Sequence, residues 1–135
     1  MIKTFLKVPP LPNMDYKNLI DTIMGLDENI RYATICDMDS NQVETRHREG
    51  VTNYLSDDET KESLDHAVSS WKSRAKLSNK IGKGKYVLAV YEKLRRVTVP
   101  LENDHLLLVT IDNQGGQSEI MDKIMNQIYG DYTQY

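Results

Sequence analysis

The residues best suited to chemistry in this sequence are three histidines and one cysteine. His47, His66 and His105 have no second histidine or cysteine at the spacing that metal ligands require. Cys36 lies within an apolar run, where a thiol is more often a small core side chain than a nucleophile. We therefore expect no catalytic residue, no metal ion and no cofactor, and we expect that the protein is not an enzyme.

The segment Gly82-Lys83-Gly84-Lys85 comes closest to a phosphate-binding loop. A P-loop needs a longer spacing between its glycines and its lysine, and it lies between a strand and a following helix. Here the glycines follow a predicted helix and precede a predicted strand. Helix termination explains them better than phosphate binding, although the lysines remain candidates for loose contact with an anion.

Basic residues concentrate between positions 72 and 96. This stretch has nine lysines and arginines and one acid, a net charge of +8, whereas the whole chain carries −3. Such asymmetry is typical of an anion-binding face or of the solvated side of a helix. A strand of roughly 20 Å separates its two groups of charges, so they need not form one patch. The candidate anion or partner surface consists of Lys80, Lys83, Lys85, Lys93, Arg95 and Arg96.

Length and composition indicate a single domain. With 135 residues, of which 39% are hydrophobic, the chain fills one core. One cysteine excludes an intrachain disulfide. No run approaches the roughly 20 apolar residues of a membrane span, and the first residues lack an apolar core of signal-peptide length. We expect a cytoplasmic protein with no membrane partner.

The apolar periodicity predicts how the chain is organised. Prolines predict an extended arm over residues 1–13, before one domain over 14–130 and a short tail over 131–135. Asn13 and Ser56 are the predicted N-caps, the second within a capping box completed by Glu59. The predicted helices cover residues 14–26, 56–78 and 118–129, and the predicted strands 30–37, 42–47, 86–92, 94–101 and 105–111.

Short connections between the last three strands require antiparallel neighbours. The expected fold class is therefore α/β (α+β), with the order α-β-β-α-β-β-β-α. Its five-stranded antiparallel sheet has two faces to cover, and three helices suffice to cover both.

This order of elements resembles the Roadblock/LC7 fold, a profilin-like architecture. Residues 30–41, an apolar strand that ends in an acidic turn, are similar to that family's first hairpin. Residues 81–86, 91–93 and 99–101 are also similar to a family of small archaeal proteins with no assigned activity. The Roadblock/LC7 resemblance implies the sheet order 2-1-5-4-3 and a homodimer, in which the long second helix and the third strand meet their copies. It also implies regulation or scaffolding of small GTPases or motor complexes, without catalysis.

The residues support a homodimer independently of the resemblance. In that sheet order the nearly uncharged strand over residues 86–91 lies at an edge, which a second copy would cover. Either Val87, Ala89 and Tyr91 or the alternate set Tyr86, Leu88 and Val90 would pack with the long helix. That helix would contribute Leu64, Val68 and Trp71, the last as a core residue or an interface anchor.

The leading hypothesis is a non-enzymatic regulatory or scaffold module that acts as a homodimer, with a small GTPase or another protein as partner. One alternative is a PAS- or profilin-like sensory domain that binds a small ligand between the sheet and a helix. The other is an anion- or nucleic-acid-binding module that uses residues 72–96. Few aromatic residues and an acidic pI disfavour specific nucleic-acid binding.

Overall fold

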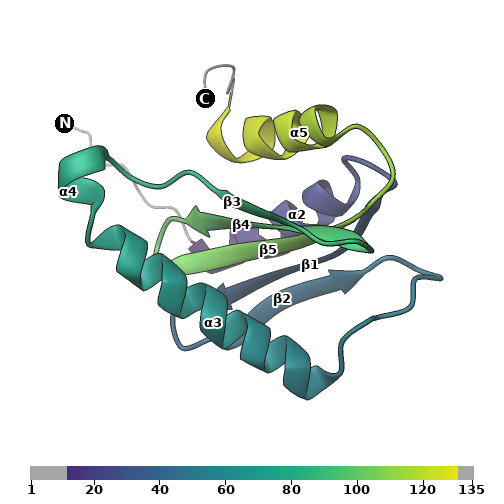
Figure 1. Ribbon diagram of the computed structural model, residues 1–135, viewed down its shortest axis with the longest axis horizontal. Coiled ribbons are helices and arrows are strands. Elements are labelled where there is room, and N and C mark those ends of the chain that lie inside the picture. Colours follow the sequence, from purple (N-terminus) through teal and green to yellow (C-terminus); the bar gives the residue numbers. More distant parts are fainter. Residues whose placement is uncertain (1–11, 131–135) are drawn as a thin grey trace.

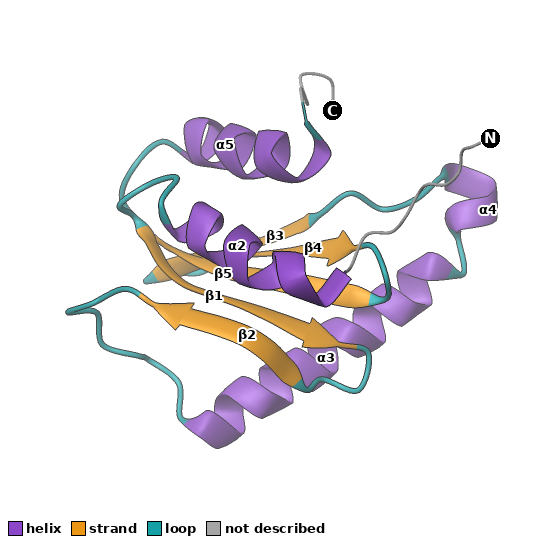
Figure 2. Ribbon diagram, turned by 180° about the vertical axis from the view of Figure 1, so that it is seen from behind, coloured by secondary structure: helices purple, strands orange, loops and turns teal. Residues whose placement is uncertain are grey.

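A five-stranded antiparallel sheet forms the centre of the computed structural model, which describes residues 12–130 (Figures 1 and 2). The strand order is β2-β1-β5-β4-β3. This is the order 2-1-5-4-3 that the resemblance implied. The strands are β1 (Ile30–Asp37), β2 (Gln42–His47), β3 (Val87–Val90), β4 (Leu94–Leu101) and β5 (His105–Asp112).

Helices cover both faces of the sheet, as predicted. Helices α2 (Pro12–Met24) and α5 (Gln117–Tyr129) lie on one face, and the long helix α3 (Asp57–Ala75) crosses the other (Figure 2). A single further turn, α4 (Ser78–Ile81), follows α3. The order of the major elements is therefore the expected α-β-β-α-β-β-β-α, whereas the predicted helix over residues 56–78 is divided after Ala75.

Successive side chains of the central strands point to opposite faces of the sheet, and this divides the core into two layers. In β1, Ala33 and Ile35 join the cluster under α2 and α5, whereas Cys36 joins the cluster under α3. In β5, Leu107 lies on the first side and Leu108 on the second. Because β1 and β5 are covered on both faces, their sequences are nearly continuous in apolar residues.

The start of α3 follows the sequence prediction. The Ser56 hydroxyl accepts a hydrogen bond of 3.1 Å from the Glu59 N–H, and the Glu59 carboxylate accepts one of 2.9 Å from the Ser56 N–H. This capping box satisfies two amides that have no partner within the helix. It fixes where α3 begins and therefore how the helix crosses the sheet.

The prediction for the first helix was wrong at its start. Helix α2 begins at Pro12, so Asn13 lies inside the helix instead of capping it. Proline is accepted in a first helical turn because the amide it lacks has no helical partner there. The remainder of the predicted arm, residues 1–11, and the predicted tail, residues 131–135, lie outside the described residues.

Strand β3 is shorter than the predicted strand over residues 86–92. Its ladder with β4 ends at the pair Val87–Thr98. Pro100 lies two residues beyond Thr98, at a position whose backbone also faces β3. Proline has no N–H, so the ladder cannot continue there. At the other end the Tyr91 N–H donates to the Leu94 carbonyl at 2.8 Å and closes the hairpin. Proline and the hairpin turn together confine β3 to four residues.

Candidate interaction surface

Strand β3 lies at an edge of the sheet, and within residues 12–130 no strand pairs with its outer side. All four of its side chains are at least partly exposed, and Val90 is 64% exposed. The opposite edge, β2, differs because it carries the ion-paired Glu44 and Arg46. Charged edge strands resist pairing with another chain, whereas apolar ones favour it. The β3 edge is thus the better candidate for an interface.

The hairpin hydrogen bond fixes which β3 backbone groups face outward. Hydrogen-bonded and non-hydrogen-bonded pairs alternate along an antiparallel ladder. Tyr91 bonds Leu94, so every second residue before Tyr91 also bonds β4. The N–H and C=O groups of Ala89 and Val87 therefore point toward β4. Leu88 and Val90 then direct their N–H and C=O groups to the free edge.

The β3 side chains divide between the two faces of the sheet. Val87 packs with the α3 cluster, whereas Tyr86 and Leu88 pack with the cluster under α2 and α5. Of the two sets considered from the sequence, the set that contains Val87 therefore lies on the α3 side.

Three helix residues predicted at the interface lie inside the protein instead. Leu64, Val68 and Trp71 are 1%, 3% and 7% exposed and pack against their own sheet. Helical periodicity identified these three as the apolar stripe of α3 but could not say whether the same chain or a partner covers it. Two roles were considered for Trp71 from the sequence, core residue and interface anchor, and within this chain it is a core residue.

A different side of α3 lies next to the β3 edge. A guanidinium N–H of Arg96, on β4, donates to the Ser63 hydroxyl. One turn further along α3, Ala67 is half-buried and packs with the cluster that includes Val87. Ser63, Ala67 and the similarly half-buried Ser70 form one flank of α3, on the side of Arg96, the β4 residue that pairs with Ala89 of β3. We call this flank together with the outer side of β3 the β3 edge surface.

Arg95 is not part of a surface patch, contrary to the sequence prediction. Its side chain is 5% exposed. Its guanidinium donates to the carbonyls of Asp112 at 2.5 and 3.0 Å, Gln114 at 2.5 Å and Gly115 at 3.4 Å. These bonds hold the β5–α5 connection, because the buried, charged guanidinium group donates to several carbonyls at once.

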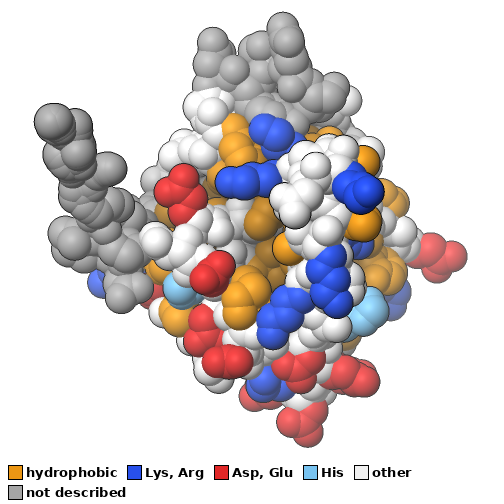
Figure 3. All heavy atoms as spheres, turned by 90° about the vertical axis from the view of Figure 1, so that its left-hand side faces the viewer, with side chains coloured by type: hydrophobic (Ala, Val, Ile, Leu, Met, Phe, Trp, Pro, Cys, Tyr) orange, Lys and Arg blue, Asp and Glu red, His pale blue; other side chains and the backbone are white. Residues whose placement is uncertain are grey.

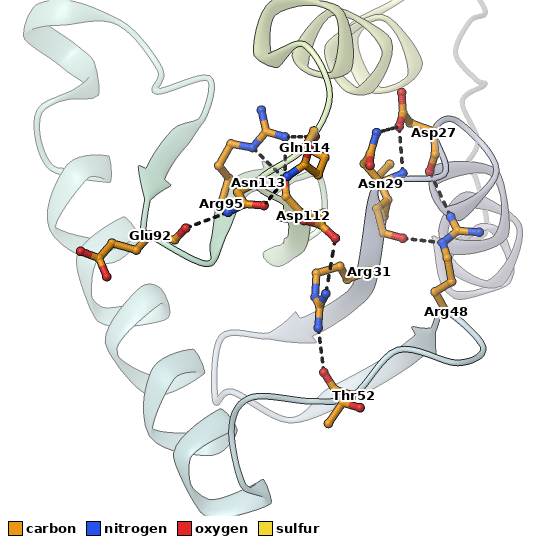
Figure 4. Close-up of polar contacts among 11 residues, drawn as sticks. Asp27, Asn29, Arg31, Arg48, Thr52, Glu92, Arg95, Asp112, Asn113 and Gln114 are labelled. Atoms are coloured by element: carbon orange, nitrogen blue, oxygen red, sulfur yellow. Dashed lines mark hydrogen bonds and ion pairs between the residues drawn. The ribbon is translucent and has the colours of Figure 1, made fainter.

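Two further arginines also donate hydrogen bonds to backbone carbonyls at this end of the sheet (Figure 4). Arg48 donates to the carbonyls of Ile30, Met24 and Asp27 at 2.7, 2.6 and 3.0 Å. Arg31 donates to the Thr52 carbonyl at 2.7 Å and lies 3.7 Å from the Asp112 carboxylate. The arginines therefore fix the loops at this end of the sheet, a role that sequence analysis did not identify.

The remaining candidate cations fall into separate groups. Arg96 is half-buried against α3, and its Nε is buried without a hydrogen-bond partner among the described residues. Lys93 lies over the Tyr54 ring and Lys85 over the Tyr129 ring. Lys80 and Lys83 are exposed in and after α4. The predicted basic stretch is thus divided between the two ends of β3.

The residues first considered for chemistry are dispersed. Cys36 is fully buried, and this burial raises the pKa of its thiol to about 11. His105 contacts the Tyr16 ring and His47 the Tyr32 ring. No group of three or more potential metal ligands gathers among residues 12–130. In the same part of the chain no helix is long and apolar enough to cross a bilayer.

Comparison with known proteins gives structural matches only. No protein-family model and no curated protein sequence matches the chain. The gliding protein MglB from Thermus thermophilus superposes with a TM-score of 0.68 at 9% identity, over 94% of this chain and 95% of the other. A structure described as MglB with a tetrameric arrangement has a TM-score of 0.69 at 10% identity, over 94% and 92%.

A Roadblock/LC7 domain from Streptomyces avermitilis also matches, with a TM-score of 0.63 at 9% identity over 84% of this chain and 91% of the other. Identities this low establish the fold and not the activity. The sheet order, the helices on both faces and these superpositions agree with one another. The chain has the Roadblock/LC7-like fold.

Proposed function

We propose that this protein is a non-enzymatic regulatory or scaffold module that acts as a homodimer through the β3 edge surface. The observation that carries the proposal is the apolar edge of β3, whose outward backbone groups lack a partner strand in residues 12–130. Antiparallel pairing of two β3 strands across a two-fold axis satisfies these groups and extends the sheet from one subunit to the next.

The flank of α3 favours the same arrangement. Ser63, Ala67 and Ser70 have small side chains, so the long helices of two subunits can approach closely beside the paired strands. The MglB structure with a tetrameric arrangement supports self-association in a protein of this fold. The Roadblock/LC7 resemblance makes a small GTPase the proposed partner of the composite surface.

The space between the sheet and α2 offers the sensory-domain alternative little support. Ile20 and Ile23 of α2 and Val109 of β5 are all fully buried there. Side chains thus occupy the position where a sensory domain would hold its ligand.

The dimer is tested with Val90→Pro and Val90→Thr. Proline removes one outward N–H, while threonine keeps this N–H and the branched side chain. Val90 is mostly exposed, so neither change disturbs the core. By light scattering at two protein concentrations, we expect wild type and Val90→Thr at twice 15.6 kDa and Val90→Pro at 15.6 kDa.

Circular dichroism should show that Val90→Pro remains folded. Val43→Asp, at the exposed valine of the β2 edge, should remain a dimer. A wild-type monomer at both concentrations would contradict the proposal. The partner is tested separately by titrating the dimer with purified small GTPases loaded with GDP or a GTP analogue. Binding should depend on the nucleotide and weaken in Val90→Pro.

A further inference from the structure

Two large aliphatic side chains are exposed to solvent at α4, one on the residue before this turn and one on its last residue. Leu77 is 53% and Ile81 80% exposed, and neither belongs to a core cluster of the described residues. The Ile81 N–H donates to the Leu77 carbonyl at 3.0 Å. The two side chains therefore lie one helical turn apart, on the same side of α4.

The structure around α4 holds this pair in place. The Ser78 hydroxyl donates to the Ala75 carbonyl at 2.9 Å, which joins α4 to the end of α3. Gly82, with a φ of 90°, reverses the chain after α4. Gly84 then packs so closely on the Trp71 ring that a Cβ at this position would lie 2.6 Å from it. Leu77 and Ile81 are thus displayed by a braced element.

The surface around this apolar pair is basic. No aspartate or glutamate occurs between positions 66 and 91. Figure 3 looks onto the end of the molecule that carries α4, where Lys and Arg side chains form a band beside apolar ones. Acidic side chains lie mostly outside that band in this view. The exposed basic residues of this region include Lys72, Arg74, Lys76, Lys80 and Lys83.

We propose that Leu77, Ile81 and the surrounding lysines bind the surface of an anionic lipid bilayer. Lysines near the surface attract anionic headgroups, and aliphatic side chains that project beyond them enter the boundary with the acyl chains. We call this group the α4 surface. The α4 surface combines positive charge with exposed apolar side chains, and the surface of an anionic membrane accommodates both.

Other anionic partners fit the α4 surface less well. Single-stranded nucleic acid is bound by stacking on aromatic side chains, and the projecting pair is aliphatic. An acidic segment without apolar side chains would leave the braced Leu–Ile pair without an apolar counterpart. The sequence-based expectation of no membrane partner rested on the absence of a spanning segment, which binding at the surface does not require.

The test is co-sedimentation of the full chain with vesicles at low and high salt. Vesicles of phosphatidylcholine alone are compared with vesicles that also contain phosphatidylglycerol. We expect binding only to the anionic vesicles, weakening as salt rises. Lys80→Glu should weaken it by more than roughly fivefold, because each lysine near the surface contributes about that factor. Lys17→Glu, an equal charge change on α2, should have less effect.

A second pair of variants tests the apolar contact. Ile81→Ser should reduce binding to anionic vesicles at least roughly tenfold, since most of an isoleucine side chain is withdrawn from the membrane. Val43→Ser, at an exposed valine of β2, should not change it. Both variants should keep the unfolding midpoint of the wild type, because neither side chain is part of the core.

Four outcomes would overturn the proposal. Equal binding to neutral and anionic vesicles would exclude the role of the lysines, and undiminished binding by Ile81→Ser would exclude insertion. Full displacement by inorganic phosphate at constant ionic strength would indicate a discrete phosphate site. Absence of binding to all vesicles at low salt would also overturn it and would favour an acidic protein as partner. None of these outcomes bears on the β3 dimer, which is measured without lipid.

Discussion

The indole Nε1 of Trp71 donates a hydrogen bond of 2.8 Å to the hydroxyl of Thr98. This bond joins the C-terminal part of α3 to β4, and the same tryptophan ring contacts Gly84 on the chain that leads into β3. One side chain therefore fixes the positions of the long helix, the strand beside the free edge and the segment after α4. Both proposed surfaces depend on this arrangement.

We expect Thr98→Val to destabilise the protein by about 1–2 kcal/mol. The substitution keeps the shape of the side chain but leaves the partly buried indole N–H without an acceptor. Urea denaturation followed by tryptophan fluorescence measures the change. Thr98→Ser keeps the hydroxyl and should cost less than Thr98→Val. Unchanged stability in Thr98→Val would show that the hydrogen bond does not contribute.

Arg95→Ala should destabilise the protein more strongly, by about 3 kcal/mol. The change removes the charged donor that satisfies the carbonyls of Asp112 and Gln114 near the start of α5. Chemical denaturation should show this loss, and hydrogen exchange should show faster opening near residues 112–116. Lys93→Ala, two residues away at an exposed position, should change stability by less than about 0.5 kcal/mol. A stable Arg95→Ala variant would contradict the structural role of this arginine.

The contact between Asp27 and α5 should make stability depend on pH. The Asn29 N–H, at 2.9 Å, lowers the pKa of the Asp27 carboxyl group, and the Lys123 ammonium group, at 3.1 Å, lowers it further. A lowered folded-state pKa contributes stability above the unfolded pKa of about 3.9, and this contribution is lost as the pH falls through the folded-state value.

Asp27→Asn should therefore be less stable than wild type at pH 7, and the difference should shrink by about pH 2. Because Lys123 is about half exposed, solvent screening should keep the difference near or below about 1 kcal/mol. Thermal unfolding of both proteins across this pH range measures it. Asp21→Asn provides a comparison at a more exposed carboxylate that is ion-paired with Arg46. A constant difference from pH 2 to pH 7 would exclude the ionised carboxylate as its cause.

Local signals accounted for most of the fold. The capping box at Ser56 and Glu59 predicted where α3 begins, because its two hydrogen bonds join residues three positions apart. Alternation along residues 94–101 predicted β4, because a strand pleats with a period of two. The start of α2 was missed because proline is compatible with both an extended arm and a first helical turn.

The candidate sites were predicted less completely. The sequence identified the apolar strand at positions 87–90 and the charge concentrated between positions 72 and 96. It did not identify Leu77 and Ile81, whose spacing is equally typical of a buried helix face. It also grouped Arg95 with Arg96, although neighbouring residues of a strand point to opposite faces of the sheet. In the structure Arg95 binds the carbonyls around Asp112 while Arg96 turns toward α3.

By itself the sequence determined the kinds of elements, their order and the absence of any charged side chain along β3, because these follow from neighbours within a few positions. Only the tertiary structure decided which side of each element is covered. Leu64, Val68 and Trp71 lie against their own sheet, whereas Ile81, equally apolar, is left in solvent. The physical reason is that burial depends on contacts between residues distant in the chain, such as Trp71 with Thr98, and no local pattern records them.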